Sequence, residues 1–168
     1  MISIIVARDS NNGIGKDNKL LFHIKEDMKR FKDLTTDKTI IMGSKTFDSL
    51  PNGVLPNRFN IVLTNNREKY NEEMYLDDIY ISNNIDFLIK EFKDSEEEVF
   101  IIGGESIYKQ FLLYANKIYL TEIHDDTKHS DSFFNFNENE FKIVYQEDKE
   151  NIHGLKYSFI NYERFNIK

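Results

Sequence analysis

VFIIGGESIYKQF, residues 99–111, is the stretch that decides the fold of this chain. Its first four residues, 99–102, are apolar without polar alternation, which is typical of a strand covered on both faces in a parallel sheet. Gly103 and Gly104 then permit backbone angles and close approaches that a side chain would block. A helix is predicted over residues 106–113. Because the start of a helix behind glycines favours anions, a phosphate is a candidate ligand. The alternative is that the two glycines only form the turn between strand and helix.

The same order of buried strand, turn and helix recurs along the chain. Strands are predicted over residues 2–7, 39–42, 60–64, 79–82 and 118–123, and helices over residues 24–34, 44–50 and 85–92. Alternating strands and helices predict right-handed crossovers and a mainly parallel sheet. Two aromatic segments, 141–146 and 157–165, flank a turn at Gly154 and predict an antiparallel hairpin at one edge.

The predicted fold is therefore α/β. It has three αβα layers around a mixed, mostly parallel sheet of about eight strands, in one domain spanning residues 1–168. Acidic segments at 72–78 and 94–98 are expected to be solvated loops.

Composition and charge exclude several function classes. Zero cysteines exclude disulfides, thiolate catalysis and cysteine-based metal sites, and the net charge of −7 argues against a nucleic-acid surface. Because no apolar run approaches the roughly 20 residues that a membrane span requires, and the first ten residues lack a secretory signal, a soluble cytoplasmic protein is expected. The four histidines lack ligand-like spacing, so no metal is predicted.

The candidate site lies at the carboxyl edge of the predicted sheet, where open α/β sheets bind ligands. The segments that follow Ala7, Thr64 and residue 123, together with the turns at Gly43 and Gly103, are its candidate walls. The tetrapeptide 43–46, GSKT, places two hydroxyls and a cation at a helix start. A Gly-x-Gly-x-x-Gly fingerprint and a Walker loop are missing, which disfavours a plain Rossmann or P-loop assignment.

Asp27 is the charge in an unusual place. It lies three residues after Ile24 and four before Phe31, beside the apolar stripe of its helix, whereas Arg30 and the other charged residues are assigned to the polar face. A carboxylate beside that stripe is expected to be partly buried, which favours protonation or demands a ligand. The alternative is an acid in the first turn that favours the helix dipole.

Five segments in order, IIVARDSNNGIGKDNKLLFHIKEDMKRFK, TIIMGSKTFDSLP, LPNRFNIVLT, VFIIGGESIYKQFL and IYLTEI, closely resemble the bacterial type of the dihydrofolate reductase family over nearly the whole chain. The resemblance implies reduction of 7,8-dihydrofolate to 5,6,7,8-tetrahydrofolate with NADPH, by hydride transfer to the pterin C6 and protonation of N5. Such a reaction supports one-carbon metabolism and thymidylate synthesis. It also implies antifolate inhibitors of the diaminopyrimidine or pteridine type. A monomer is the default expectation, because no surface heptad or apolar patch can be identified, and neither nucleic acid nor a membrane is expected as a partner.

Residue by residue, the family's active-site carboxylate corresponds to Asp27, and Thr121 corresponds to the threonine of its network. Arg58 matches the arginine that pairs with the glutamate carboxylate of folate. The resemblance places these further residues around the substrate: Ile5, Val6, Met28, Phe31, Leu50, Leu55 and Ile102. For the apolar side chains among them, core packing is the alternative.

The resemblance also places many residues around the dinucleotide, with Leu20 on a mobile lid and a cis peptide between Gly103 and Gly104. The implied cofactor-binding residues are Ala7, Ile14, Gly15, Leu20, Gly43, Ser44, Lys45, Thr46, Leu63, Thr64, Asn65, Ile102, Gly103, Gly104, Glu105, Ser106, Ile107 and Tyr108.

Two departures from the family pattern affect the site. Leu21-Phe22 replaces a common Pro-Trp, so Phe22 occupies a catalytic position without an indole donor, and proton delivery is expected to differ. Ser44 stands where an arginine often grips the 2′-phosphate of NADPH, which leaves Lys45, Thr64 and Arg67 as candidates for that contact. Two alternatives stay open: the related pyrimidine reductase of riboflavin synthesis, and a non-catalytic folate- or nucleotide-binding module.

Overall fold

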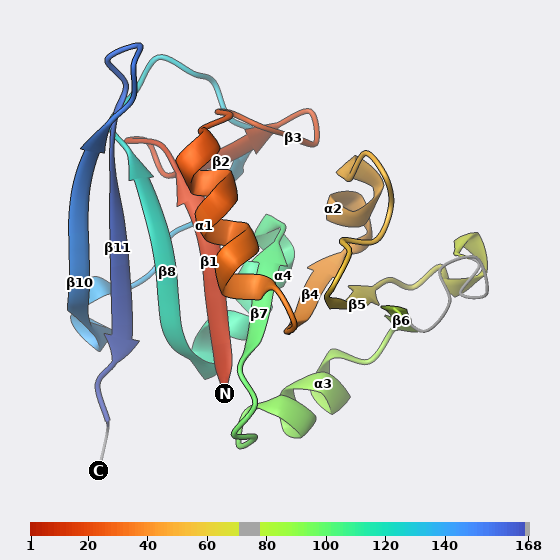
Figure 1. The fold of residues 1–168 in the computed structure, drawn as a ribbon. Helices are drawn as coiled ribbons and strands as arrows, with labels where there is room; N and C mark the ends of the chain where they lie inside the picture. Colours follow the sequence, from red (N-terminus) through yellow and green to blue (C-terminus); the bar gives the residue numbers. More distant parts are fainter. Residues whose placement is uncertain (71–77, 167–168) are drawn as a thin grey trace.

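The computed structural model describes residues 1–70 and 78–166, which form an eight-stranded sheet with helices on both faces (Figure 1). The order of its strands is β10-β11-β8-β1-β7-β4-β5-β6. These strands are β1 (Ile2–Arg8), β4 (Thr39–Gly43), β5 (Phe59–Leu63), β6 (Ile79–Ser82), β7 (Val99–Gly103), β8 (Ala115–Ile123), β10 (Phe141–Glu150) and β11 (Lys156–Arg164). The helices are α1 (Lys25–Thr35), α2 (Ser44–Ser49), α3 (Ile85–Phe92) and α4 (Glu105–Phe111), with short 3-10 turns at Arg67–Lys69, Leu112–Tyr114 and Glu138–Glu140.

The strand pairing confirms the predicted mixed sheet. From β8 to β6, each strand pairs in parallel with its neighbour, because a helix or a long connection returns the chain between them. The last strand, β11, pairs antiparallel with β8, and β10 pairs antiparallel with β11. The aromatic tail thus forms the expected edge hairpin.

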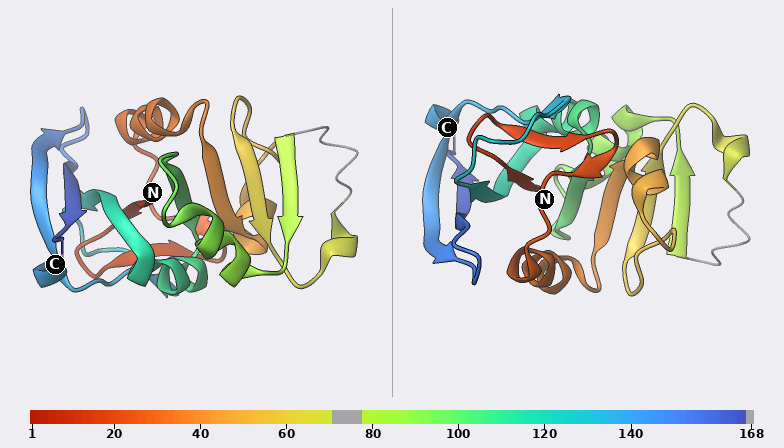
Figure 2. Two further views of the ribbon diagram at one scale, coloured as in Figure 1. Left: turned by 90° about the horizontal axis from the view of Figure 1, so that it is seen from below. Right: turned by 90° about the horizontal axis from the view of Figure 1, so that it is seen from above.

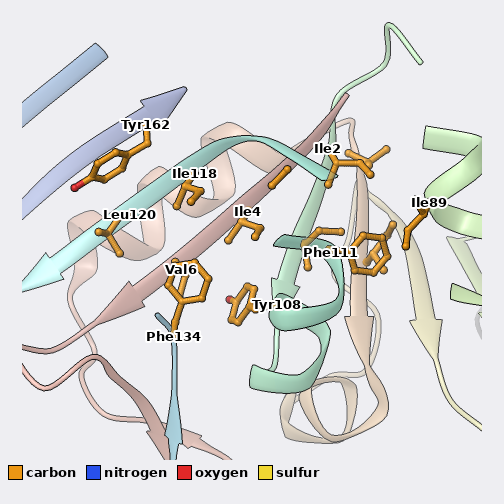
Figure 3. Packing of buried hydrophobic residues seen from close by; sticks show 14 of the residues in the cluster. Ile2, Ile4, Val6, Ile89, Tyr108, Phe111, Ile118, Leu120, Phe134 and Tyr162 are labelled. Atoms are coloured by element: carbon orange, nitrogen blue, oxygen red, sulfur yellow. The ribbon is translucent and has the colours of Figure 1, made fainter. Parts of the chain in front are cut away.

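Alternating side chains of β1 separate two core layers. Ile4 and Val6 lie in one cluster with Phe111 of α4 on one face, and Figure 3 shows Tyr108 between Val6 and Phe111. Ile5 points to the other face, where a second cluster contains Phe47 of α2 and the half-buried Phe31 of α1. The two views of Figure 2 show helices above and below the sheet, as the predicted three layers require.

A second, three-stranded sheet occupies the long segment that sequence reasoning assigned to a loop. It contains β2 (Gly13–Lys16) and β3 (Lys19–Leu20), and β2 also pairs with β9 (Ser132–Phe133). Asp17 and Asn18 join β2 to β3 with φ of 50° and 59°, the positive values that a two-residue type I′ hairpin turn requires. The pair Asp-Asn was the sequence signal for this hairpin.

Element ends differ from the predicted ones by a few residues. Helix α4 starts at Glu105 and stops at Phe111, so Leu113 lies in a 3-10 turn and is 77% exposed. In β10, the predicted alternation is broken by a shift of register between Ile143 and Tyr145, which leaves both side chains about half exposed.

The acidic segments are exposed only in part. Most of residues 94–98 is exposed, but Glu98 is half-buried and accepts hydrogen bonds from the Ser3 and Tyr119 hydroxyls. Asp78 is exposed, and residues 72–77 lie outside the described residues. Among the helices of residues 1–70 and 78–166, none has the length and apolar character that crossing a membrane needs.

Candidate active site

Asp27 lies in the first turn of α1, on the side that faces the sheet. The Thr121 hydroxyl of β8 donates a hydrogen bond of 2.5 Å to Asp27 Oδ1. Burial raises the pKa of the Asp27 carboxyl above its ordinary value, while the Thr121 hydrogen bond and the positive charge of Arg30 act in the opposite direction. The structure brings Asp27 and Thr121 together, and the carboxyl is partly withdrawn from solvent.

Arg30 corrects the sequence interpretation, which placed it on the solvated face of α1. Its side chain is half-buried and turns toward the sheet, where Nη1 donates to Thr121 Oγ1 over 3.5 Å. Its Nη2 donates to Asn161 Oδ1 of β11. Sequence reasoning missed Arg30 because helical spacing alone leaves it at the border between the two faces of α1. It also missed Asn161, which lies in β11.

An apolar wall extends from Asp27 along α1 toward α2. Phe31, Leu50 and Leu55 are half-buried and pack against the cluster that contains Ile5. Met28 differs from this group because it is 51% exposed. Ile102 is half-buried at the end of β7, so the predicted apolar residues lie together on one face of the sheet, with Met28 at its open side.

The carbonyl of Ile5 already has a partner within the protein. The buried Tyr108 hydroxyl of α4 donates to it over 2.8 Å, and burial raises the pKa of Tyr108. Val6, the next residue, is buried in the opposite core layer, so its side chain points away from the wall. Tyr108 thus ties α4 to the strand that carries the wall.

Arg58 lies beside this wall. Its Nε donates to the Pro56 carbonyl over 2.9 Å and its Nη1 to Thr35 Oγ1 over 3.2 Å, while its guanidinium lies 6.0 Å from the centre of the Phe31 ring. These bonds use two of its five N–H donors. The arginine is therefore held in place at the end of α1.

Two glycine turns meet at the carboxyl edge of the sheet. Met42 of β4 pairs with Gly103 of β7, and the Gly103–Gly104 peptide is cis, as the resemblance implied. A methyl group added at Gly104 would lie 3.6 Å from the Thr46 hydroxyl oxygen, which is an ordinary contact. The backbone at Gly104 therefore stays open to a ligand, with Thr46 of α2 beside it.

Other predicted cofactor residues surround these turns. Gly43, Ser44 and Ile107 are half-buried, and a methyl group at Gly43 would lie 3.0 Å from the Ile107 side chain. Lys45 and Ser106 are exposed. Leu63 is buried at the end of β5, where Thr64 is half-buried, and Ala7 is half-buried in β1.

The second sheet contains the residues predicted to form the lid, and it contacts α2. Leu20 is 54% exposed at the end of β3, and the Asn18 side chain donates to the Lys45 carbonyl over 2.7 Å. Gly15 is buried, and a methyl group there would lie 2.8 Å from the Lys19 carbonyl oxygen, so the position has no room for a side chain. The neighbouring Ile14 packs against the core. Glu105 also supports the lid, since its carboxylate accepts a hydrogen bond from the Phe133 backbone.

A polar hollow follows the ends of β5 and β6. Its cavity volume is about 240 Å³, and its lining is Asn65, Arg67, Tyr80, Ile81, Ser82, Asn83, Asn84 and Phe87. Sequence reasoning named Asn65 but missed Ser82 and Asn83, although Ser82 ends a predicted strand at the same edge and Asn83 follows it.

Phe22 sits apart from the polar groups. Its ring packs with Ile24, Ile123 and Phe159, and the Lys128 ammonium lies 5.6 Å from the ring centre. The side chain supplies apolar cover at this end of the site and no proton donor.

The carboxyl edge of this doubly wound sheet brings together a half-buried carboxylate, an apolar wall and two glycine turns. These features define the class of protein as a nucleotide-dependent α/β enzyme that acts on a small, flat substrate. A family model described as dihydrofolate reductase matches residues 1–164. The chain belongs to the dihydrofolate reductase family.

Individual relatives agree with this assignment. Dihydrofolate reductase of Bacillus subtilis is 37% identical over 99% of this chain and 96% of its own length, and that of Staphylococcus haemolyticus is 38% identical over 97% and 95%. A structure described as dihydrofolate reductase from Enterococcus faecalis complexed with NADP(H) and RAB-propyl superposes with a TM-score of 0.85 at 26% identity, covering 99% of this chain and 97% of that one.

The family is one of NADPH-dependent oxidoreductases that reduce dihydrofolate to tetrahydrofolate and bind antifolates. This assignment decides against the pyrimidine reductase alternative, since the family model and these relatives are all dihydrofolate reductases.

Proposed function

We propose that the chain reduces 7,8-dihydrofolate to 5,6,7,8-tetrahydrofolate with Asp27 as its active-site carboxylate. The observation that carries this proposal is the Asp27 carboxyl itself, which is partly buried at the head of an apolar wall and hydrogen-bonded by Thr121. When bound, NADPH supplies the hydride that reaches the pterin C6.

Asp27 would accept hydrogen bonds from the pterin amino group and ring nitrogen, and its negative charge would favour a proton at N5. Thr121 would hold that carboxylate in position through its 2.5 Å bond. Because Phe22 carries no donor, water that reaches the pterin would be the immediate proton carrier. Phe22 would exclude further solvent from this end of the site.

The rest of the substrate would lie along the apolar wall. Phe31, Leu50 and Leu55 offer an apolar surface to the aminobenzoyl group, with Met28 at the open side and Ile5 and Ile102 at the pterin end. The remaining N–H donors of Arg58 would pair with the glutamate carboxylate.

The turns at the carboxyl edge would hold the cofactor. The pyrophosphate would meet the backbone and hydroxyls of the Gly43–Thr46 turn and the Gly103–Gly104 turn, which the Thr46 side chain joins. The adenosine would enter the polar hollow beside Asn65, and the lid with Leu20 would cover the nicotinamide. The remaining residues of the predicted set, Ala7, Ile14, Gly15, Leu63, Thr64, Glu105, Ser106, Ile107 and Tyr108, would shape or support this surface.

Lys45 gives a test of cofactor selectivity. It is exposed at the start of α2, and we propose that it meets the 2′-phosphate of NADPH in place of the missing arginine at Ser44. We expect Lys45→Ala to weaken NADPH binding about tenfold and NADH binding much less, with the difference shrinking as salt rises.

Fluorescence titration with both cofactors at low and high salt measures this effect. Lys38→Ala is the matched control, because Lys38 is an exposed lysine just before the opposite end of β4. Equal losses for NADPH and NADH in Lys45→Ala would rule out the proposed contact.

The function itself is tested by NADPH oxidation on addition of dihydrofolate, with tetrahydrofolate identified as the product. Loss of NADPH absorbance that depends on dihydrofolate is the expected result. Tight binding of both ligands without hydride transfer in a single turnover would instead favour a non-catalytic binding module.

We also propose that residues 1–168 act as a single-domain monomer in the cytoplasm, which sedimentation and cell fractionation can test.

A further inference from the structure

Arg30 is a half-buried cation that the reaction as proposed above does not use. We propose that Arg30 is a positioning residue that acts through Thr121 to keep the Asp27 carboxyl ionised, and so sets the pH range in which the site works. The consequence for catalysis rests on the proposed function, whereas the effect on Asp27 itself does not.

The three side chains form a directed chain of hydrogen bonds. Arg30 Nη1 lies 3.5 Å from Thr121 Oγ1, and Thr121 Oγ1 lies 2.5 Å from Asp27 Oδ1. A guanidinium only donates, so Thr121 accepts from Arg30, and the hydroxyl directs its single proton to Asp27 Oδ1. This arrangement fits an ionised Asp27, whose Oδ1 accepts the hydrogen bond.

The guanidinium is held in place by contacts on its other sides. Nη2 donates to Asn161 Oδ1, and Cζ lies 4.6 Å from the ring centre of Phe159 and 5.9 Å from that of Tyr119. Such cation–π contacts stabilise a partly desolvated guanidinium. Burial lowers the pKa of Arg30, yet an arginine stays protonated in proteins, so the charge beside Thr121 is permanent.

The surroundings of Asp27 shift the pKa of its carboxyl in opposite directions. Burial raises its pKa, and the Thr121 hydrogen bond and the Arg30 charge lower it. Because Arg30 supplies the nearby positive charge, its removal leaves burial opposed by Thr121 alone, and the pKa of Asp27 should rise.

Other elements packed near Asp27 present neutral phenols to it. Tyr108 of α4 donates to the Ile5 carbonyl, and Tyr157 of β11 donates to Glu26 Oε2 over 3.1 Å. The pKa of each phenol is raised, first by burial and further by nearby carboxylates that include Asp27, so both stay neutral in the pH range in which Asp27 titrates.

Charged groups of β10 face Arg30 and the start of α1. Lys149 Nζ lies 2.8 Å from Glu147 Oε1 and 3.1 Å from Glu26 Oε2, and the Tyr145 hydroxyl donates to Glu147. Lys149 is thus paired with two carboxylates, which leaves Arg30 as the cation that acts on Asp27.

The test is a direct titration of Asp27 by carbon-13 NMR of the full chain labelled in the aspartate carboxyls. Asp27→Asn identifies the resonance. We expect Arg30→Met, which keeps the length and apolar packing of the side chain over Phe159, to raise the titration midpoint by about one pH unit, a tenfold higher proton affinity. Arg30→Lys keeps the charge and should restore most of the wild-type midpoint.

Lys29→Met is the matched control, because it removes a charge from the neighbouring position of α1 where Lys29 pairs with Asp33 on the surface. It should leave the midpoint unchanged. An unchanged midpoint in Arg30→Met, or equal displacement in Arg30→Met and Arg30→Lys, would overturn the proposal. The titration needs no turnover, so a chain without reductase activity would contradict the proposed function and still answer this question.

Discussion

Replacing Asp27 with asparagine is expected to lower kcat/KM for dihydrofolate at neutral pH by roughly 100-fold or more, the range associated with a group that assists proton transfer. Asparagine keeps the shape and the hydrogen bond with Thr121 but carries no charge to support a proton at N5. We expect part of the lost rate to return as pH falls, because solvent acid then replaces that support. Steady-state rates across pH with NADPH as the hydride donor measure this recovery.

The same variant should be at least as stable as the wild type at neutral pH. Burial raises the pKa of Asp27 above its value in the unfolded chain, so the folded state loses stability as pH rises through that pKa. Asparagine has no charge to bury, and the difference in Tm between the two proteins should therefore vanish in acid. An activity that survives unchanged across pH would contradict the role of Asp27, and a large drop in Tm would show that the loss of activity reflects misfolding.

Replacing Gly104 with alanine is expected to weaken NADPH binding tenfold or more, about 1.4 kcal/mol for each factor of ten. The added methyl group would meet only the Thr46 hydroxyl within the described structure, at 3.6 Å, so the fold should tolerate it. The loss would therefore come from the space that the dinucleotide needs above the backbone. Calorimetric titration with NADPH, alongside thermal unfolding of the free protein, separates the two effects.

Gly103→Ala is the comparison for that experiment. Gly103 has φ of +125°, which side chains rarely adopt, and a methyl group there would lie 3.4 Å from the Tyr108 hydroxyl. We expect this variant to lose Tm as well as cofactor binding. Normal NADPH binding by Gly104→Ala would contradict the proposed cofactor contact at this glycine and would leave the glycine pair with a structural role alone.

Much of the fold could be predicted from the chain alone, because its signals are local. The unbroken apolar residues of 99–102 and the two glycines after them predicted β7 and the turn behind it, and the repeated order of strand and helix predicted the parallel sheet. The same local reasoning placed Asp27 beside an apolar stripe. Local signals were weaker for the lid, where β2 and β3 are short and β2 pairs with β9, more than a hundred residues away.

The candidate site, like the fold, combines features that local sequence predicts with contacts that depend on distant residues. The sequence by itself determined the family, the order of the elements, the carboxylate at Asp27 and the glycines at the sheet edge, since each depends on neighbouring residues. Only the tertiary structure decided that Thr46 lies beside Gly104, and that Arg30 turns inward to reach Thr121 and Asn161, positions 91 and 131 residues away. The physical reason is that a side chain at the edge of a helix face takes its direction from the partners that distant strands bring to it.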